Sequence, residues 1–184
     1  GRANEAFTEL RTAAAANPHY APNLIDLAWG ISHSNLNTTE ALLDIKDDNE
    51  RLSLIQFLAR KARGEEVLDQ ILKLNTQLSA QQRDDVARLL YDAKAFRESF
   101  DLSHPHGKYR DPLIVNSDFE DPLVLNDSGF GWIIAPQQKN HLAIDVSEKQ
   151  HGAKSLQIKL DNSWPSGTPL LSQTVIVNAG TAYR

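Results

Sequence analysis

Cysteine and methionine are both absent from the 184 residues of this chain. The lack of Cys excludes disulfide bonds, thiolate metal sites and thiol nucleophiles, but it leaves the cellular compartment open. No apolar run approaches the roughly 20 residues that span a bilayer, and no signal peptide is visible at the first residues. Because the chain opens within an apparent helix and lacks an initiator Met, we expect it to be an excerpt of a longer protein.

Clustered positive charge is also scarce. Residues before Gly107 carry 12 Lys+Arg against 16 Asp+Glu, and residues after it carry 7 against 8. Nucleic acid is therefore not an expected partner, because phosphate binding needs grouped Lys and Arg. The one local basic group, Arg60-Lys61-Arg63, falls at the end of a predicted helix, where cations complement the helix dipole.

Motifs for catalysis are missing as well. The sequence contains no Gly-x-Ser-x-Gly, no His-Glu-x-x-His and no phosphate-binding glycine loop. The placement of Asp and Glu marks no carboxylate pair for glycoside cleavage, and His33, His141 and His151 have no nucleophile motif beside them. We therefore predict a protein that is not an enzyme.

Residues 1–103 alternate between apolar helical stripes and short polar turns. The Ala-rich segment from Asn4 to Ala16 predicts a helix that Asn17-Pro18 ends, Pro22 suits the first turn of the next helix, and Ser79 is a predicted N-cap. Such faces cannot be buried singly, so we predict six or seven helices stacked as hairpins. The expected inward positions are Leu24, Leu27, Ala28 and Ile31; Leu52, Ile55, Leu58 and Ala59; Val67, Leu68, Ile71, Leu72 and Leu74; and Val86, Leu89, Leu90 and Ala93.

The first two of these helices resemble the second helix of one tetratricopeptide repeat and the first helix of the next. The residues that carry the resemblance are Ala6, Leu10, Ala13 and Pro18, followed by Leu24, Leu27, Ala28 and Ile31. It covers about 35 residues, and beyond Asn37 only the helix-turn-helix rhythm remains. The resemblance implies a right-handed α-α superhelix that binds a protein or peptide along a concave surface.

On that surface the candidate polar contacts are Asn23, Asp26 and Ser34. The alternative is that these three residues belong to solvated helix faces. Trp29 is expected to be a packing residue rather than a recognition residue.

Composition changes at Ser103-His104-Pro105-His106-Gly107, which predicts a linker over residues 104–111 and a second domain over residues 112–184. Short alternating segments there predict strands, of which two sheets sharing a core are the economical arrangement. The expected strands are Leu113–Val115, Phe130–Ile134, His141–Val146, Lys154–Leu160 and Leu170–Val177. The fold class is thus multidomain α + β, with helical hairpins followed by an antiparallel β-sandwich.

An ordered set of short motifs in residues 113–184 resembles the galactose-binding-like jelly rolls that serve as carbohydrate-binding modules of bacterial glycoside hydrolases. The motifs are Asn116-Ser117-Asp118-Phe119-Glu120, Gly131-Trp132, His151-Gly152-Ala153-Lys154-Ser155-Leu156, Ser172-Gln173 and Ala179-Gly180-Thr181-Ala182-Tyr183. A jelly roll has about eight strands, whereas five or six can be drawn here. We therefore expect an incomplete sandwich whose natural chain continues past Arg184.

This resemblance implies binding of a poly- or oligosaccharide, with an aromatic ring stacked on a sugar face. The candidate residues are Trp164, Trp132 and Gln173, although Trp132 is expected more often to pack the core. Related modules carry a structural calcium ion, for which Glu120, Asp118 and Asp161 are candidate ligands, with the alternative that they form turns. No other cofactor is expected.

Together these expectations describe a non-catalytic bacterial scaffold, in which helical hairpins bind protein and a sandwich binds carbohydrate, at the cell envelope or secreted rather than in the cytoplasm. Two alternatives stay open. Both domains can serve protein interaction alone, or the chain can be the accessory region of a glycoside hydrolase.

Overall fold

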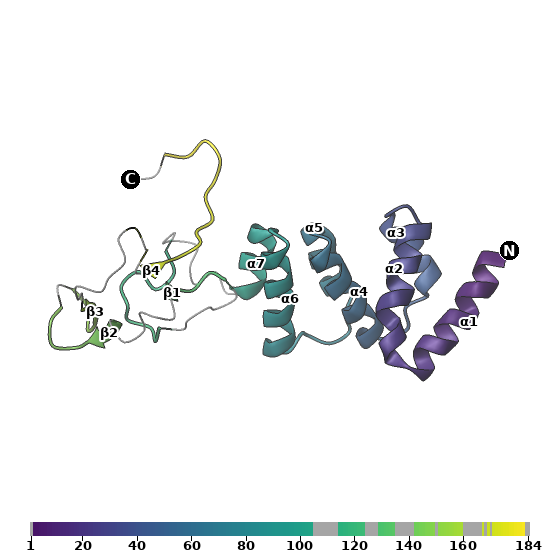
Figure 1. The fold of residues 1–184 in the computed structure, drawn as a ribbon, viewed down its shortest axis with the longest axis horizontal. Helices are drawn as coiled ribbons and strands as arrows, with labels where there is room; N and C mark the ends of the chain where they lie inside the picture. Colours follow the sequence, from purple (N-terminus) through teal and green to yellow (C-terminus); the bar gives the residue numbers. More distant parts are fainter. Residues whose placement is uncertain are drawn as a thin grey trace. The chain divides into compact units, whose positions relative to one another are not determined.

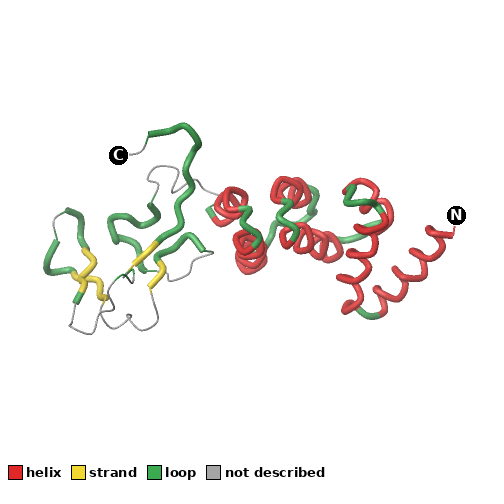
Figure 2. Tube along the Cα trace, turned by 45° about the horizontal axis from the view of Figure 1, so that its top comes forward, coloured by secondary structure: helices red, strands yellow, loops and turns green. Residues whose placement is uncertain are grey.

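The computed structural model describes residues 2–104, 114–123, 129–134, 142–149, 151–159, 167, 169 and 171–182. The chain divides into two compact units, Gly1–Ser99 and Phe100–Arg184. Helices occupy the described residues up to Ser103, and short antiparallel strands follow after residue 132, as Figure 2 shows by colour. The described part of the molecule is therefore mixed α and β and mostly helical.

Seven α-helices and one 3₁₀ helix make up the described N-terminal part (Figure 1). This agrees with the predicted six or seven helices. None of the described helices is both long and apolar enough to cross a membrane. The helices are α1 (Arg2–Ala16), η1 (Pro18–Tyr20), α2 (Ala21–Ile31), α3 (Leu36–Leu43), α4 (Asp48–Arg60), α5 (Gly64–Leu72), α6 (Ala80–Asp92) and α7 (Phe96–Ser103).

Helix α4 lies at the centre of the first unit, where it contacts α2, α5 and α6. Its side chains Leu54, Ile55 and Leu58 are fully buried, and Phe57 meets Trp29 of α2 edge-on, with ring centroids 5.7 Å apart. The predicted packing role of Trp29 is therefore confirmed. Because α4 touches three other helices, its apolar face is the core on which this unit is built.

The turns that follow α2, α4 and α6 share one geometry. In each, a residue in the left-handed region precedes an N–H that donates to the carbonyl five residues earlier, and this bond closes the helix. The left-handed residues are His33 (φ 52°), Ala62 (φ 58°) and Lys94 (φ 68°). The three turns thus share this closing bond, and the turn after α2 has a second left-handed residue, Ser34 (φ 62°).

Helix α3 is the one for which the sequence shows no distinct apolar stripe. Asn35 caps it by accepting from Thr38 N at 2.9 Å, and its buried residues are Thr39 and Leu43. Thr39 donates to Asn35 O at 2.8 Å and lies 2.7 Å from the Ser32 hydroxyl, so a buried polar chain ties α3 to the end of α2. Capping and buried polar contacts therefore stabilise α3, whereas apolar side chains at helical spacing stabilise the neighbouring helices.

Asp48, in the first turn of α4, fixes the connection between α5 and α6. One carboxylate oxygen accepts from both nitrogens of Asn75 at 3.0 Å, and the other accepts from Thr76 N at 2.9 Å and its hydroxyl at 2.7 Å. The backbone N–H of Asn75 and the donors of Thr76 lower the pKa of Asp48 below its usual value. The charged form is therefore the one that the fold favours.

We expect this carboxylate to make folding sensitive to acid. Since the folded pKa of Asp48 is depressed, its contribution is present above the unfolded pKa and is lost as pH falls through the folded pKa, below about pH 4. Asp48→Asn should lower Tm at pH 7 and flatten the dependence of Tm on pH in that window. Thermal unfolding followed by circular dichroism measures both effects, with the exposed Asp84→Asn on α6 as the control. Equal pH profiles for the two variants would contradict the assignment.

Gly30 and Gly64 offer a matched pair of substitutions. A methyl group added at Gly30, on the exposed side of α2, meets nothing within 4 Å, so Gly30→Ala should raise the free energy of unfolding by about 0.5–1 kcal/mol. The same methyl at Gly64, the first residue of α5, would lie 2.6 Å from Glu98 Cγ of α7, so Gly64→Ala should give no such gain. Urea titration measures both. In a Glu98→Ala background, Gly64→Ala should raise the free energy of unfolding. If Gly64→Ala alone raises it as well, Glu98 moves aside freely.

In the second unit the strands form two ladders, and both are antiparallel. Strand β1 (Ile133–Ile134) pairs with β4 (Leu171–Ser172), and β2 (Leu142–Asp145) pairs with β3 (Ser155–Ile158). In the second ladder Leu142 faces Ile158 and Ile144 faces Leu156, so the predicted apolar alternation falls in register on one face. The jelly-roll sandwich expected for this unit and the right-handed superhelix expected for the helices both stay predictions.

The structure shortens every expected strand for which it gives residues. Val115 and Asn116, expected at and just beyond the end of a strand, lie in a turn, and Leu113 is outside the described residues. Only Leu171–Ser172 of the expected segment 170–177 is paired as a strand among the described residues. The predicted linker residue His104 ends the helical region, where its ring stacks on Phe100 with centroids 4.4 Å apart.

Candidate functional site

A cavity of about 370 Å³ lies between α1, α2 and the start of α4. Small and branched apolar side chains form most of its wall, and polar groups from α1 and the first turns of α4 form the rest. The lining residues are Arg11, Ala14, Ala15, Ala21, Leu24, Ile25, Leu43, Ile45, Asp47, Asn49, Glu50 and Ser53. A hollow of this size and composition suits one or two apolar side chains of a partner.

The polar groups at this cavity are held in place by the fold. Arg11 Nη1 donates to Leu42 O at 2.8 Å, and Asp47 caps α4 by accepting from Glu50 N at 2.9 Å. The Glu50 carboxylate accepts from Lys46 N at 2.7 Å. These bonds hold Arg11, Asp47 and Glu50 in fixed orientations at the cavity.

An exposed apolar stripe runs along α2 past the cavity. Tyr20, Leu24, Leu27 and Ile31 follow one another at intervals of four, three and four residues, and Leu24 also lines the cavity. Tyr20, Leu27 and Ile31 are 52%, 44% and 49% exposed. We call this set the α2 stripe.

The α2 stripe corrects the inward face expected for this helix. Of Leu24, Leu27, Ala28 and Ile31, only Ala28 is buried. The side chains that pack inward are Ile25, Ala28 and Trp29, with Ser32 at the C-cap. Both faces carry apolar residues at helical spacing, so periodicity alone did not distinguish the packed face from the open one.

The three predicted interaction residues are all exposed, but they are not all beside the α2 stripe. Asn23 is exposed one helical turn before Leu27, and Asp26 is exposed on another side of α2, where its carboxylate is 3.5 Å from Lys61 Nζ. Ser34 is exposed in the following turn, where its N–H donates to Trp29 O at 3.0 Å. Asn23 is therefore the one closest to the stripe along the helix surface.

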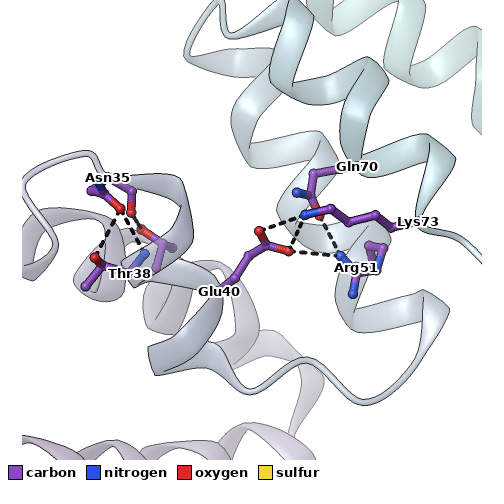
Figure 3. A network of polar contacts seen from close by, with 7 residues as sticks. Asn35, Thr38, Glu40, Arg51, Gln70 and Lys73 are labelled. Atoms are coloured by element: carbon purple, nitrogen blue, oxygen red, sulfur yellow. Dashed lines mark hydrogen bonds and ion pairs between the residues drawn. The ribbon is translucent and has the colours of Figure 1, made fainter.

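A polar network joins α3, α4 and α5 beside this region (Figure 3). Glu40 accepts from Lys73 Nζ at 2.9 and 3.0 Å and from Arg51 Nη1 at 3.1 Å. Arg51 Nη1 also donates to Gln70 Oε1 at 2.6 Å. Sequence reasoning did not find this network, because its members lie up to 33 residues apart and belong to no motif.

Glu40 is the centre of that network. Burial alone would raise the pKa of Glu40, but the hydrogen bonds from Lys73 and Arg51 outweigh it and lower the pKa below its usual value. Gln70 is fully buried and its amide also lowers the pKa of Glu40. Its Nε2 has no hydrogen-bond partner among the residues that the structure describes. The network is thus a built ionic contact that holds α3, which supplies Leu43 to the cavity, against α4 and α5.

In the second unit, Trp132 and Gln173 come together around one turn. Trp132 Nε1 donates to Asn116 O at 3.2 Å, and its ring stacks on Phe119 with centroids 5.4 Å apart. Gln173 Oε1 accepts from Val115 N at 2.9 Å while its Nε2 donates to Val115 O at 3.0 Å. Both side chains hold the turn at residues 115–121, and Trp164, the third candidate for sugar binding, lies outside the described residues.

Glu120 and Asp118 lie in that same turn. The Glu120 carboxylate accepts from the backbone N–H of Ala153, and it accepts from that of Lys154 at 3.0 Å. Lys154 Nζ donates to the backbone carbonyl of Glu120. Asp118 accepts from Glu120 N at 3.3 Å. Asp161 is outside the described residues, and within the described part no three His, Asp or Glu side chains are grouped so as to hold a metal ion.

A search for relatives adds no family to this description. The chain matches no protein-family model, no curated protein and no solved structure. The likeness to tetratricopeptide repeats and to galactose-binding-like jelly rolls therefore rests on the quoted residues alone. The site defined by geometry is the cavity with the α2 stripe beside it.

Proposed function

We propose that the helical unit is a non-catalytic protein-interaction module whose binding surface is the α2 stripe together with the adjoining cavity. The observation that carries the proposal is the continuous row of Tyr20, Leu24, Leu27 and Ile31, three of which are well exposed and one of which opens into a hollow of about 370 Å³. Apolar side chains that line up beside a cavity are typical of interaction sites.

The occupant that this surface fits is one face of an amphipathic helix. The stripe repeats every three to four residues, so a helix lying against α2 presents side chains at the same spacing. Burial of Leu27 and Ile31 by such a helix removes apolar surface from water at two positions that the fold leaves open. One anchoring side chain then enters the cavity beside Leu24.

The carbohydrate-binding prediction for residues 112–184 stays a prediction. Two of its three residues, Trp132 and Gln173, already make hydrogen bonds that stabilise their own unit, and these bonds do not favour a ligand role. The accessory-region alternative likewise depends on sequence outside this chain. The α2 stripe combines an exposed apolar row with a cavity.

The proposal is tested with a helical peptide of about 15 residues, since shorter helices are marginal in water. The peptide carries Leu at alternating spacings of three and four and uncharged Gln elsewhere. We expect it to bind the protein more tightly than a scrambled peptide does, and the double variant Leu27→Gln/Ile31→Gln to remove that preference. Isothermal titration calorimetry measures the affinity.

Leu72→Gln is the control. Leu72 was expected to face inward, but it is 83% exposed on another helix of the same unit, so that prediction was wrong. Peptide binding by this variant should equal that of the unchanged protein. Circular dichroism checks that all three proteins have the same helix content. Equal loss of binding in both variants, or no preference over the scrambled peptide, would refute the α2 stripe as the binding surface.

A further inference from the structure

Acidic residues are concentrated in the part of the chain that carries the proposed binding surface. Residues 1–50 contain 3 Lys+Arg and 8 Asp+Glu, whereas residues 51–99 contain 9 and 7. The first segment forms α1, α2, α3 and the start of α4, which are the elements around the cavity. The segment that forms most of the cavity therefore has an excess of acidic residues, whereas residues 51–99 have a small excess of basic residues.

Some of these carboxylates are neutralised and others are not. Glu40 is paired with Arg51 and Lys73, Asp44 is paired with Lys46 at 2.6 Å, and Asp26 is paired with Lys61 at 3.5 Å. At the cavity itself, Asp47 and Glu50 accept only backbone N–H groups in the bonds that the structure shows for them, and Arg11 is the single cation among the lining residues. The lining thus keeps an excess of negative charge.

We infer that the partner helix is basic, with Lys or Arg beside its apolar face. This inference rests on the proposed function and adds the charge of the partner to it. Opposite charges steer the encounter and discriminate between partners, and they act over about 8 Å at physiological salt. Asp47 and Glu50 at the cavity are placed to meet such flanking cations.

Three peptides with the same Leu face separate this inference from the proposed function. One carries Lys at its remaining positions, one carries Gln and one carries Glu. We expect the affinity to fall in the order Lys, Gln, Glu, with about tenfold between the extremes, which corresponds to about 1.4 kcal/mol. Raising the salt concentration should reduce the differences, because the rim charges are exposed.

Two variants locate the charge effect. Asp47→Asn/Glu50→Gln, in which Asn keeps the N-cap of α4, should weaken binding of the Lys peptide and leave that of the Gln peptide unchanged, whereas Leu27→Gln/Ile31→Gln should weaken both. Asp84→Asn/Asp85→Asn on α6 has the same change in net charge and is the control. A scrambled Lys peptide measures binding of cations without an apolar face.

The outcomes are distinct. Equal affinities for the three peptides, each lost in Leu27→Gln/Ile31→Gln, would overturn the basic partner and keep the binding surface. Equal weakening by the α6 control would show a general charge effect and also overturn the inference. Self-association of the protein in sedimentation, abolished by Leu27→Gln/Ile31→Gln, would make a second copy of the chain the occupant and would contradict the basic helix.

Discussion

Replacing Leu58 by Ala should lower the free energy of unfolding by about 2–5 kcal/mol. Leu58 is fully buried in α4, the helix that contacts α2, α5 and α6, and Leu54 and Ile55 on the same helix are buried equally well. Truncation removes apolar burial and leaves a cavity that three neighbouring helices can close only in part. Urea titration followed by circular dichroism measures the loss, because the helical signal comes mainly from this unit.

Leu72→Ala is the control for this experiment. Leu72 is on α5, next to α4 in sequence, but it is 83% exposed. The same change there should cost within about 0.5 kcal/mol, as is usual for surface substitutions. A comparable loss at both positions would show that α4 is not the core of the unit.

The second large effect is expected at Phe130, in the unit that contains the strands. Phe130 is fully buried and meets Phe100 edge-on with centroids 5.1 Å apart, and His104 lies at 6.4 Å. Phe130→Ala removes an aromatic side chain from this cluster and should cost about 3–5 kcal/mol. The stability of this unit should therefore depend on one ring from the segment before β1.

Hydrogen exchange measures this loss within the unit concerned. Phe130→Ala should reduce protection of amides in residues 115–121 and 129–134, whereas protection in α4 serves as an internal reference. Val146→Ala, at a position 66% exposed after β2, is the control and should leave protection unchanged. Unchanged protection in Phe130→Ala would mean that the ring contributes little to folding.

Local signals in the sequence predicted much of the helical unit. Ser79 does cap α6, and it forms a capping box with Gln82, as the order of polar residues before an apolar run suggests. Val86 and Leu90 are buried on the same helix, at positions expected to face inward. These features depend on neighbours within one or two turns, which the sequence contains directly.

The site was harder to predict, because it depends on which of two apolar faces meets another helix. On α2, Ile25 and Trp29 pack inward while Leu27 and Ile31 stay exposed, although all four are large and apolar. The contacts of α2 with α1, α3 and α4 decide between the faces, and these contacts join residues far apart in sequence, such as Trp29 and Phe57. The pairing of Glu40 with Lys73 was missed for the same reason, because it also depends on how helices pack and joins residues far apart in sequence.

The β unit shows a third kind of limit. The alternation of Leu142 and Ile144 opposite Ile158 and Leu156 was recognisable, since it is a property of each strand. The role of Gln173 was not, because its side chain replaces a strand partner by bonding both polar groups of the Val115 backbone. The sequence does not distinguish a polar residue that binds a ligand from one that stabilises the fold, because the residue type is the same in both.

The order of contacts among the helices also implies a gradient of local stability. Helix α1 packs against α2, α3 and η1 at one end of the row, while α4 has neighbours on several sides. In assemblies built from nearest-neighbour contacts, terminal elements open with the least free energy, so α1 should exchange its amide protons fastest and α4 slowest. Local opening of α1 would then open the cavity without unfolding the rest of the unit. A partner that fills the cavity would favour the closed position of α1 and slow amide exchange in that helix.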